Sequence, residues 1–429
     1  MLIYVDQITE RLIYTLDFIF KDRKIHYQLT NDWREFKQSE LPKFVYSDRD
    51  EEHFFRISPA EILFDEDLFE YSVQKDLFHE HEFLKINKVT DPFASVFYVL
   101  SRYEEYHLKH PDIHDRFTAA QSILYQFGWH QSCICDRWAE FLIHFLEKQL
   151  QIELAPKKIP SSIRPTFDID NTFAFKWKSR WRNLASKFRD RIRKDHERLL
   201  AREAFEQGNE KDPYDSFEYI RGIKHRGFDV LLFWLSSSHS KYDRNISILD
   251  SRHQQLIQTL GEDLQIGLHP SYKSNEHFEL LEKEKSGLES CLGNPISCSR
   301  QHFLKLKLPE TYLRLLKVGF TDDYTMGFSD QAGFRAGTAR SFLWFDLHKN
   351  RPSQLRVHPF AYMDGTLNEY MRMDPVQAKE LIQKLYLEVK KYGGEFICIW
   401  HNETITDFGS WKGWNEVLEF TLKLEENEI

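Results

Sequence analysis

The 429-residue chain has few cysteines and no long apolar run, and each absence excludes a class of protein. Five scattered cysteines do not fit a disulfide framework and favour a reducing compartment; they are Cys133, Cys135, Cys291, Cys298 and Cys398. No stretch approaches the roughly 20 apolar residues that a transmembrane helix requires. The first residues lack a basic segment followed by an apolar one, so we expect no signal peptide and a cytoplasmic protein.

An excess of positive charge is also absent. The net charge of −9 argues against nucleic acid as the main ligand. A hydrophobic content of 41%, with 15% aromatic residues, excludes a disordered chain. Because the length exceeds that of one typical core, we expect two domains.

A proline-containing segment, residues 155–162, divides the chain and is typical of a linker. Residues 1–154 are predicted to form a smaller mixed α/β accessory domain, with strands at 42–46 and 54–57. Helices are expected after Asp91-Pro92, where Asp91 would cap the first turn, and from Asp136 to about Leu150.

Residues 163–429 alternate apolar runs with helical patterns. Strands are predicted at 163–167, 228–235, 264–268, 296–299 and 395–400. The continuous apolar run 228–235 indicates a strand buried on both faces, as in parallel sheets. About seven strand–helix units predict a (β/α) barrel. An open doubly wound sheet is the alternative, but no glycine-rich phosphate loop follows the first strand.

A basic helical insertion, residues 177–210, interrupts this alternation. Trp181, Leu184, Phe188, Ile192 and Leu199 form an apolar stripe among arginines and lysines. One interpretation is that residues 177–205 form an amphipathic helix that contacts an anionic membrane or a lipid-linked substrate. The alternative is a surface helix packed across the barrel mouth. We prefer the second interpretation because the stripe is narrow and acidic residues are interspersed.

Polar side chains follow several predicted strands at their carboxyl ends, where a parallel barrel builds its active site. They include Asp168, Asp170, His269, Arg300, His302, Asp323 and His401. Carboxylates and imidazoles bind catalytic divalent cations that keep open positions. Such a cation lowers the pKa of water to about 7, a nearby carboxylate can take the water proton, and a histidine can protonate the leaving group. The sequence therefore predicts a metal-dependent hydrolytic site.

The segment Thr166-Phe167-Asp168-Ile169-Asp170 resembles the T-F-D-D-G motif of the polysaccharide deacetylases of the NodB-homology type, carbohydrate esterase family 4. One residue is inserted between the two carboxylates. The resemblance covers residues 163–429 and implies an irregular (β/α)7 barrel that removes N- or O-acetyl groups from carbohydrates. It implies a divalent metal, most often Zn2+, with Co2+ or Ni2+ as alternatives. By this likeness Asp168 is the catalytic base and Asp170 a metal ligand.

Other motifs of that family are matched only in part. Its second motif has two histidines four residues apart, whereas this chain has His269 and then Lys273. By the resemblance His269 is a ligand and Arg300 orients the base. His302 is expected to replace the missing ligand, and His358 is the alternative.

The resemblance implies that His401, after an apolar strand, is the general acid. Asp323 is expected to orient it. Four residues near the strand ends are predicted to contact the substrate: Tyr272, Arg335, Trp400 and Asn402. The expected substrate is a carbohydrate, free or linked to a lipid or nucleotide. The alternatives are hydrolysis of another non-peptide C–N bond and a catalytically inactive barrel that binds glycans.

Overall fold

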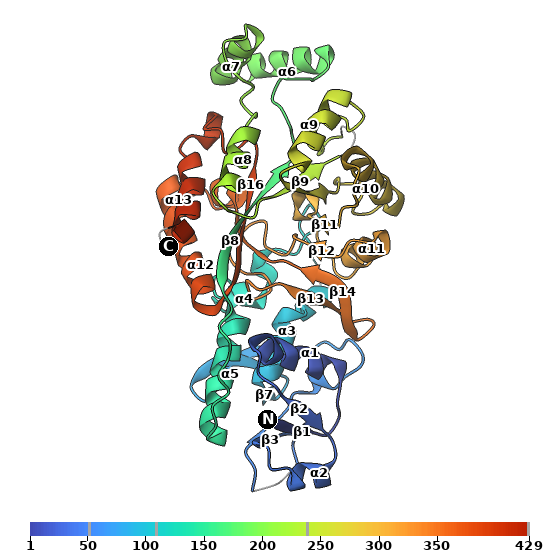
Figure 1. Ribbon diagram of the computed structural model, residues 1–429, viewed down its shortest axis with the longest axis vertical. Helices are drawn as coiled ribbons and strands as arrows, with labels where there is room; N and C mark the ends of the chain where they lie inside the picture. The colour runs from blue at the N-terminus through green and yellow to red at the C-terminus, as the bar shows by residue number, and fades with distance from the viewer. Residues whose placement is uncertain (50–52, 108–109, 237–239, 427–429) are drawn as a thin grey trace.

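The computed structural model describes residues 1–49, 53–107, 110–236 and 240–426 (Figure 1). Its N-terminal part contains two small sheets, one parallel in the order β2-β1-β3-β4 and one antiparallel in the order β5-β6-β7. The strands are β1 (Leu2–Val5), β2 (Gln28–Thr30), β3 (Lys43–Tyr46), β4 (Arg56–Ile57), β5 (Val73–Phe78), β6 (His81–Ile86) and β7 (Val89–Thr90). The helices are α1 (Glu10–Ile19), α2 (Trp33–Gln38), α3 (Pro92–Leu100), α4 (Ile123–Gln126) and α5 (Ile134–Leu150).

Helix α3 is the buried centre of this part. Asp91 caps it as expected, because one carboxylate oxygen accepts hydrogen bonds from the N–H groups of Phe93 (2.9 Å) and Ala94 (3.2 Å). Pro92 occupies the first turn, where no N–H donor is required. Every residue of α3 is buried, so the helix packs on all sides.

The second part is built on a nine-stranded sheet in the order β13-β14-β12-β11-β10-β9-β8-β16-β15. All neighbours are parallel except β13 and β14. The strands are β8 (Ser161–Ile169), β9 (Leu231–Leu235), β10 (Gln265–His269), β11 (Cys298–Ser299), β12 (Asp322–Asp323), β13 (Phe342–Asp346), β14 (Arg351–Val357), β15 (Phe360–Met363) and β16 (Gly394–His401). The helices around it are α8 (Phe217–His225), α9 (Ser251–Gly261), α10 (Phe278–Leu292), α11 (Glu310–Val318), α12 (Pro375–Tyr392) and α13 (Asn415–Glu426).

Strand positions show where the sequence prediction holds and where it shifts. β9 is buried along its whole length, as its continuous apolar run predicts. β8 begins at Ser161, so the last two residues of the predicted linker 155–162 belong to a strand. The predicted strands 264–268, 296–299 and 395–400 correspond to β10, β11 and β16.

Chain continuity requires this sheet to curl. β14 pairs with β12 near one edge of the strand order, and β15 pairs with β16 at the other edge. Only His358 and Pro359 separate the two strands in sequence. In a flat sheet the seven intervening steps would place β14 and β15 roughly 34 Å apart. Two linking residues cannot span that distance, so the flanks curl towards each other and the carboxyl strand ends gather together.

The two parts of the chain share a hydrophobic core. Polar contacts also join them: Arg11 Nε donates to Asn350 Oδ1 (2.6 Å), and the Tyr14 hydroxyl donates to the Leu343 carbonyl (2.8 Å). The buried Arg335 guanidinium binds Glu105 with two hydrogen bonds, of 2.9 and 2.5 Å. The division into two domains stays a prediction.

The basic insertion forms two helices, α6 (Arg180–Ile192) and α7 (His196–Glu206), at the end of the molecule farthest from the N-terminus (Figure 1). The preferred interpretation of a helix packed across the barrel mouth is wrong for α6. Its apolar stripe faces solvent, with Trp181 82% and Phe188 67% exposed. Across the described segments of the chain, no helix combines the length and apolar character required to cross a bilayer.

Candidate active site

Asp168 and Asp170 project from the carboxyl end of β8 towards the same side, because residues two apart in a strand share a face. Asp168 is buried, and its Oδ1 accepts a hydrogen bond of 2.8 Å from Arg300 Nη1. Arg300 is held in turn: its Nε donates to the Tyr324 carbonyl (3.0 Å), and its guanidinium lies 4.3 Å from the Phe233 ring centre. Arg300 therefore fixes one oxygen of Asp168 by an ion pair.

Two imidazoles are turned towards Asp170. His269 Nδ1 donates to the Arg300 carbonyl (2.6 Å), and its Nε2 lies 3.1 Å from Asp170 Oδ1. His302 Nδ1 lies 2.9 Å from Asp243 Oδ1, and its Nε2 is 3.1 Å from Asp170 Oδ2. In both rings an oxygen acceptor holds Nδ1 and leaves Nε2 pointing at the same carboxylate. This is how metal-binding histidines are oriented in proteins.

Asp170, His269 and His302 fit a divalent cation. Their potential ligand atoms all lie within 4.8 Å of one another, and two imidazoles with a carboxylate are a donor set that zinc prefers. Asp170 Oδ1 is buried and makes no hydrogen bond within the described segments of the chain, because its 3.1 Å contact with His269 Nε2 lacks hydrogen-bond geometry. Burial would raise the pKa of Asp170, but the His302 and His269 imidazoles outweigh it and lower that pKa well below its usual value. The carboxylate is thus kept ionised, as a ligand requires.

His401, at the end of β16, faces the same carboxylate from the other side. Its Nδ1 lies 2.9 and 3.1 Å from the two oxygens of Asp364, and its Nε2 is 3.7 Å from Asp170 Oδ2. Burial would lower the pKa of His401, but the Asp364 carboxylate outweighs it and raises that pKa well above its usual value. His401 therefore stands protonated beside the site.

The expectation that Asp323 orients His401 is wrong, since Asp364 takes that position. Asp364 directly follows β15, the strand that pairs with β16, whereas Asp323 lies in β12. Asp323 instead accepts hydrogen bonds from Ser299 Oγ (3.1 Å) and Thr325 Oγ1 (2.8 Å). It stabilises the turn after its own strand.

Comparisons with known proteins add a family and two remote structures. Residues 1–151 match a family model described as "Family of unknown function (DUF7033)". No curated protein matches the chain.

Both structures align with 63% of this chain. A protein from Mycobacterium smegmatis assigned as a polysaccharide deacetylase is 15% identical, is covered over 85% of its length and gives a TM-score of 0.40. A polysaccharide deacetylase from Bacillus cereus is 8% identical, is covered over 89% and gives a TM-score of 0.31. Likenesses this remote leave the chemical argument to the geometry of the site.

A cavity of about 230 Å3 opens beside these groups. Besides the residues above, its lining includes Arg116, Phe303, Glu369, Tyr370, Glu403 and Trp411. Tyr272 lies behind one wall, with its ring centre 5.4 Å from that of Phe303. Arg116 comes from the N-terminal part, and no local pattern in the sequence distinguishes it from the other arginines. Glu403 stands two residues after His401, so its position at a strand end could have identified it.

Trp400 and Asn402 do not line this cavity, in contrast to the prediction. Trp400 is buried in the hydrophobic core, and its Nε1 donates to the Tyr362 hydroxyl (3.3 Å). It flanks His401 in β16, so the pleat turns its side chain to the opposite face. Asn402 Nδ2 donates to the Tyr214 carbonyl (3.0 Å) and thereby holds a loop.

Arg335 and His358 also lie elsewhere. Arg335 is buried against Glu105 in the contact between the two parts. His358 Nε2 lies 2.8 Å from Asp322 Oδ1, and its ring stacks on Tyr324 with centres 4.3 Å apart. The structure therefore offers His302, and not His358, as the third candidate ligand.

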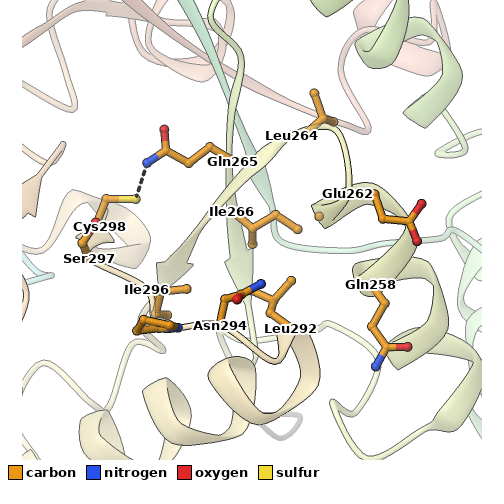
Figure 2. A pocket seen from close by; sticks show the side chains of 12 residues that line it. Gln258, Glu262, Leu264, Gln265, Ile266, Leu292, Asn294, Ile296, Ser297 and Cys298 are labelled. Carbon is orange, nitrogen blue, oxygen red and sulfur yellow. Dashed lines mark hydrogen bonds between the residues drawn. The ribbon is translucent and has the colours of Figure 1, made fainter.

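A larger cavity, of about 320 Å3, lies at the amino ends of β10 and β11 (Figure 2). Gln265 reaches across it towards Cys298, with 3.7 Å between Nε2 and Sγ. Glu262 is the one ionisable carboxylate in its lining, so the cavity lacks the paired acid and base groups of the site at the opposite strand ends.

Proposed function

We propose that this protein is a metal-dependent hydrolase that removes an acetyl or similar acyl group from a carbohydrate. The observation that carries the proposal is the convergence on one cavity of a three-residue ligand set, a carboxylate paired with Arg300, and a protonated imidazole. Asp170, His269 and His302 would hold the cation. Asp168 and His401 would supply the base and the acid.

Zinc or a similar cation, when bound, polarises an acyl oxygen and lowers the pKa of water. The side chains around it then have separable tasks. Asp168, oriented by its ion pair with Arg300, takes a proton from the attacking water. His401, kept protonated by Asp364, gives its proton to the departing nitrogen or oxygen of the sugar. Water thereby adds to the acyl carbon, the acyl bond breaks, and a carboxylic acid and a free amine or hydroxyl leave.

The cavity walls support a carbohydrate as substrate. Tyr370 and Trp411 offer aromatic faces, and Arg116, Glu369 and Glu403 offer hydrogen-bonding groups. Sugars present apolar ring faces and a rim of hydroxyls, which this combination suits. The resemblance of residues 166–170 to the deacetylase motif supports the same class. We further propose that residues 351–363 act as one strand of a closed (β/α)7 barrel, since they pair with both β12 and β16.

Metal analysis with three variants tests the function. Purified full-length protein, dialysed and then loaded with zinc, cobalt or nickel, should bind one equivalent and release acetate from N-acetylated oligosaccharides. Asp170→Ala should lose both the metal and turnover. Asp168→Asn should keep the metal but lose turnover by about 100-fold or more. Asp67→Ala, at an exposed carboxylate of the N-terminal part, is the matched control and should retain both.

The outcomes separate the alternatives. Full activity in Asp170→Ala would refute the assignment of the ligands. A wild-type protein that binds sugar without metal and releases no acetate would instead be a glycan-binding barrel.

A further inference from the structure

Helix α6 buries its polar face. Asn183, Ser186 and Asp190 recur at helical spacing and point towards α7. Asp190 is only 2% exposed, and its Oδ2 lies 3.1 Å from Arg202 Nη2 and 3.4 Å from Arg198 Nε. This buried ion-pair cluster fixes which side of α6 faces the protein.

The opposite face of α6 is therefore forced outward, and it is apolar. It consists of Trp181, Leu184, Phe188 and Ile192, which are three or four residues apart and so lie on one side of the helix. All four side chains are more than half exposed. An ordinary surface helix has the reverse arrangement, with its apolar side against the core.

Basic side chains border this apolar face on both sides. With 3.6 residues per turn, Arg180, Lys187 and Arg191 lie along one edge, and Arg182, Arg189 and Arg193 lie along the other. Residues 178–194 contain eight basic residues and one acidic residue, in a chain whose net charge is −9. The positive charge is thus concentrated around the exposed apolar stripe.

We propose that α6 docks on an anionic lipid bilayer and lies in the plane of its surface. Trp181, Leu184, Phe188 and Ile192 would enter the boundary between headgroups and acyl chains. The flanking arginines and lysines have long stems that let their charges reach lipid phosphates on either side. A second copy of this chain would cover the apolar stripe but would bring an equal positive charge to both edges. The charge pattern therefore favours lipid.

Docking would turn the candidate active site towards the membrane. The segment that carries α6 leaves directly from the carboxyl end of β8, where Asp168 and Asp170 lie. Glu197 of α7 accepts a hydrogen bond from the Gly409 N–H (3.3 Å) and pairs with Lys412 (3.1 Å). Trp411, between those two residues, lines the cavity. The surface of α6 and the wall of the cavity are thus parts of one connected end of the molecule.

Vesicle sedimentation with the full-length protein tests the docking. The protein should sediment with vesicles of equal phosphatidylglycerol and phosphatidylcholine, and far less with phosphatidylcholine alone or at high salt. Trp181→Ser with Phe188→Ser should weaken binding at least about tenfold, since both rings lose their burial in the bilayer. Arg191→Glu with Arg193→Glu should weaken it about 25-fold or more, because each basic charge near an anionic surface contributes on the order of fivefold.

Two controls keep the result specific. Leu387→Ser removes an exposed apolar side chain from α12 and should bind vesicles as the wild type does. Asp170→Ala should also bind normally, so failure of docking and failure of the hydrolase are distinguished. Circular dichroism should be unchanged in all variants, because the polar inner face of α6 is untouched.

Three results would overturn the proposal. The first is no sedimentation with anionic vesicles. The second is binding to neutral vesicles that is as strong as binding to anionic vesicles and that is unchanged in both double variants. The third is self-association that Trp181→Ser abolishes, without vesicle binding, because the apolar stripe would then be covered by a second copy.

Discussion

Glu105 joins the two parts of the protein through a buried ion pair, and its replacement by Gln should be strongly destabilising. Its carboxylate binds Arg335 Nε (2.9 Å) and Nη2 (2.5 Å) and also Arg102 Nε (2.7 Å). Arg102 keeps a second partner, Glu104, at 2.7 Å. Arg335 would keep the Gly327 carbonyl (3.1 Å) and at most the neutral amide oxygen of the new Gln side chain, so its charge would stay buried without a counter-ion.

Removing one member of such a pair typically costs about 3–5 kcal/mol. Urea denaturation followed by circular dichroism should show this loss for Glu105→Gln. Glu416→Gln is the matched control: it breaks the exposed pair with Lys379 (3.2 Å) and should cost less than about 1 kcal/mol. Adding Arg335→Met to Glu105→Gln should recover much of the loss, since the unpaired charge is then removed. Equal small losses in Glu105→Gln and Glu416→Gln would refute the reasoning.

The ion pair between Glu105 and Arg335 should also make the stability of the protein depend on pH. Burial would raise the pKa of Glu105, but Arg335 and Arg102 outweigh it and hold that pKa below its unfolded value of 4.5. A depressed folded pKa contributes stability above the unfolded pKa, and that stability is lost as the pH falls. The difference between wild type and Glu105→Gln should therefore shrink below about pH 4.5.

Three further results are expected. Burial lowers the pKa of His253 to about 4, below its unfolded value of 6.5. The free energy of unfolding should therefore be highest above pH 6.5 and fall by up to about 3 kcal/mol as the pH is lowered towards 4. Urea denaturation at several pH values should show that this part of the pH dependence is absent from His253→Gln. Arg116→Ala should raise KM several-fold with unchanged metal content, and an unaltered KM would exclude contact with substrate. His358→Gln should retain its metal, because His358 pairs with Asp322 outside the cavity; metal loss would return it to the ligand set.

The parts of the fold that the sequence predicts are those with a strong local signal. The apolar run at β9 and the Asp91-Pro92 helix start are visible in the chain without any tertiary knowledge. The placing of Asp168, Asp170, His269 and His302 in one cavity follows from a single topological rule, that parallel strands end together.

The remaining features depend on contacts between distant residues. β14 contains Pro352 and alternates in exposure, so its sequence resembles a loop. The sequence alone could not show that Asp364, and not Asp323, orients His401. That choice requires knowing that β15, and not β12, adjoins β16. Asp243 holds His302 by a hydrogen bond between residues 59 apart in the chain, which has no local sequence signature. The outward apolar face of α6 depends on the ion pairs of Asp190 with α7.

Arg116 gives the N-terminal part a direct share in the lining of the candidate active-site cavity. Its guanidinium donates to the Phe303 carbonyl (2.9 Å) and lies near the Tyr370 ring, so it bridges two walls that belong to the second part of the chain. Without the N-terminal part, residues 163–429 would lose this wall of the cavity and would expose the hydrophobic core that the two parts share. Substitutions in the N-terminal part, remote in sequence from the strands that carry the candidate ligands, can thus alter which molecules enter the cavity.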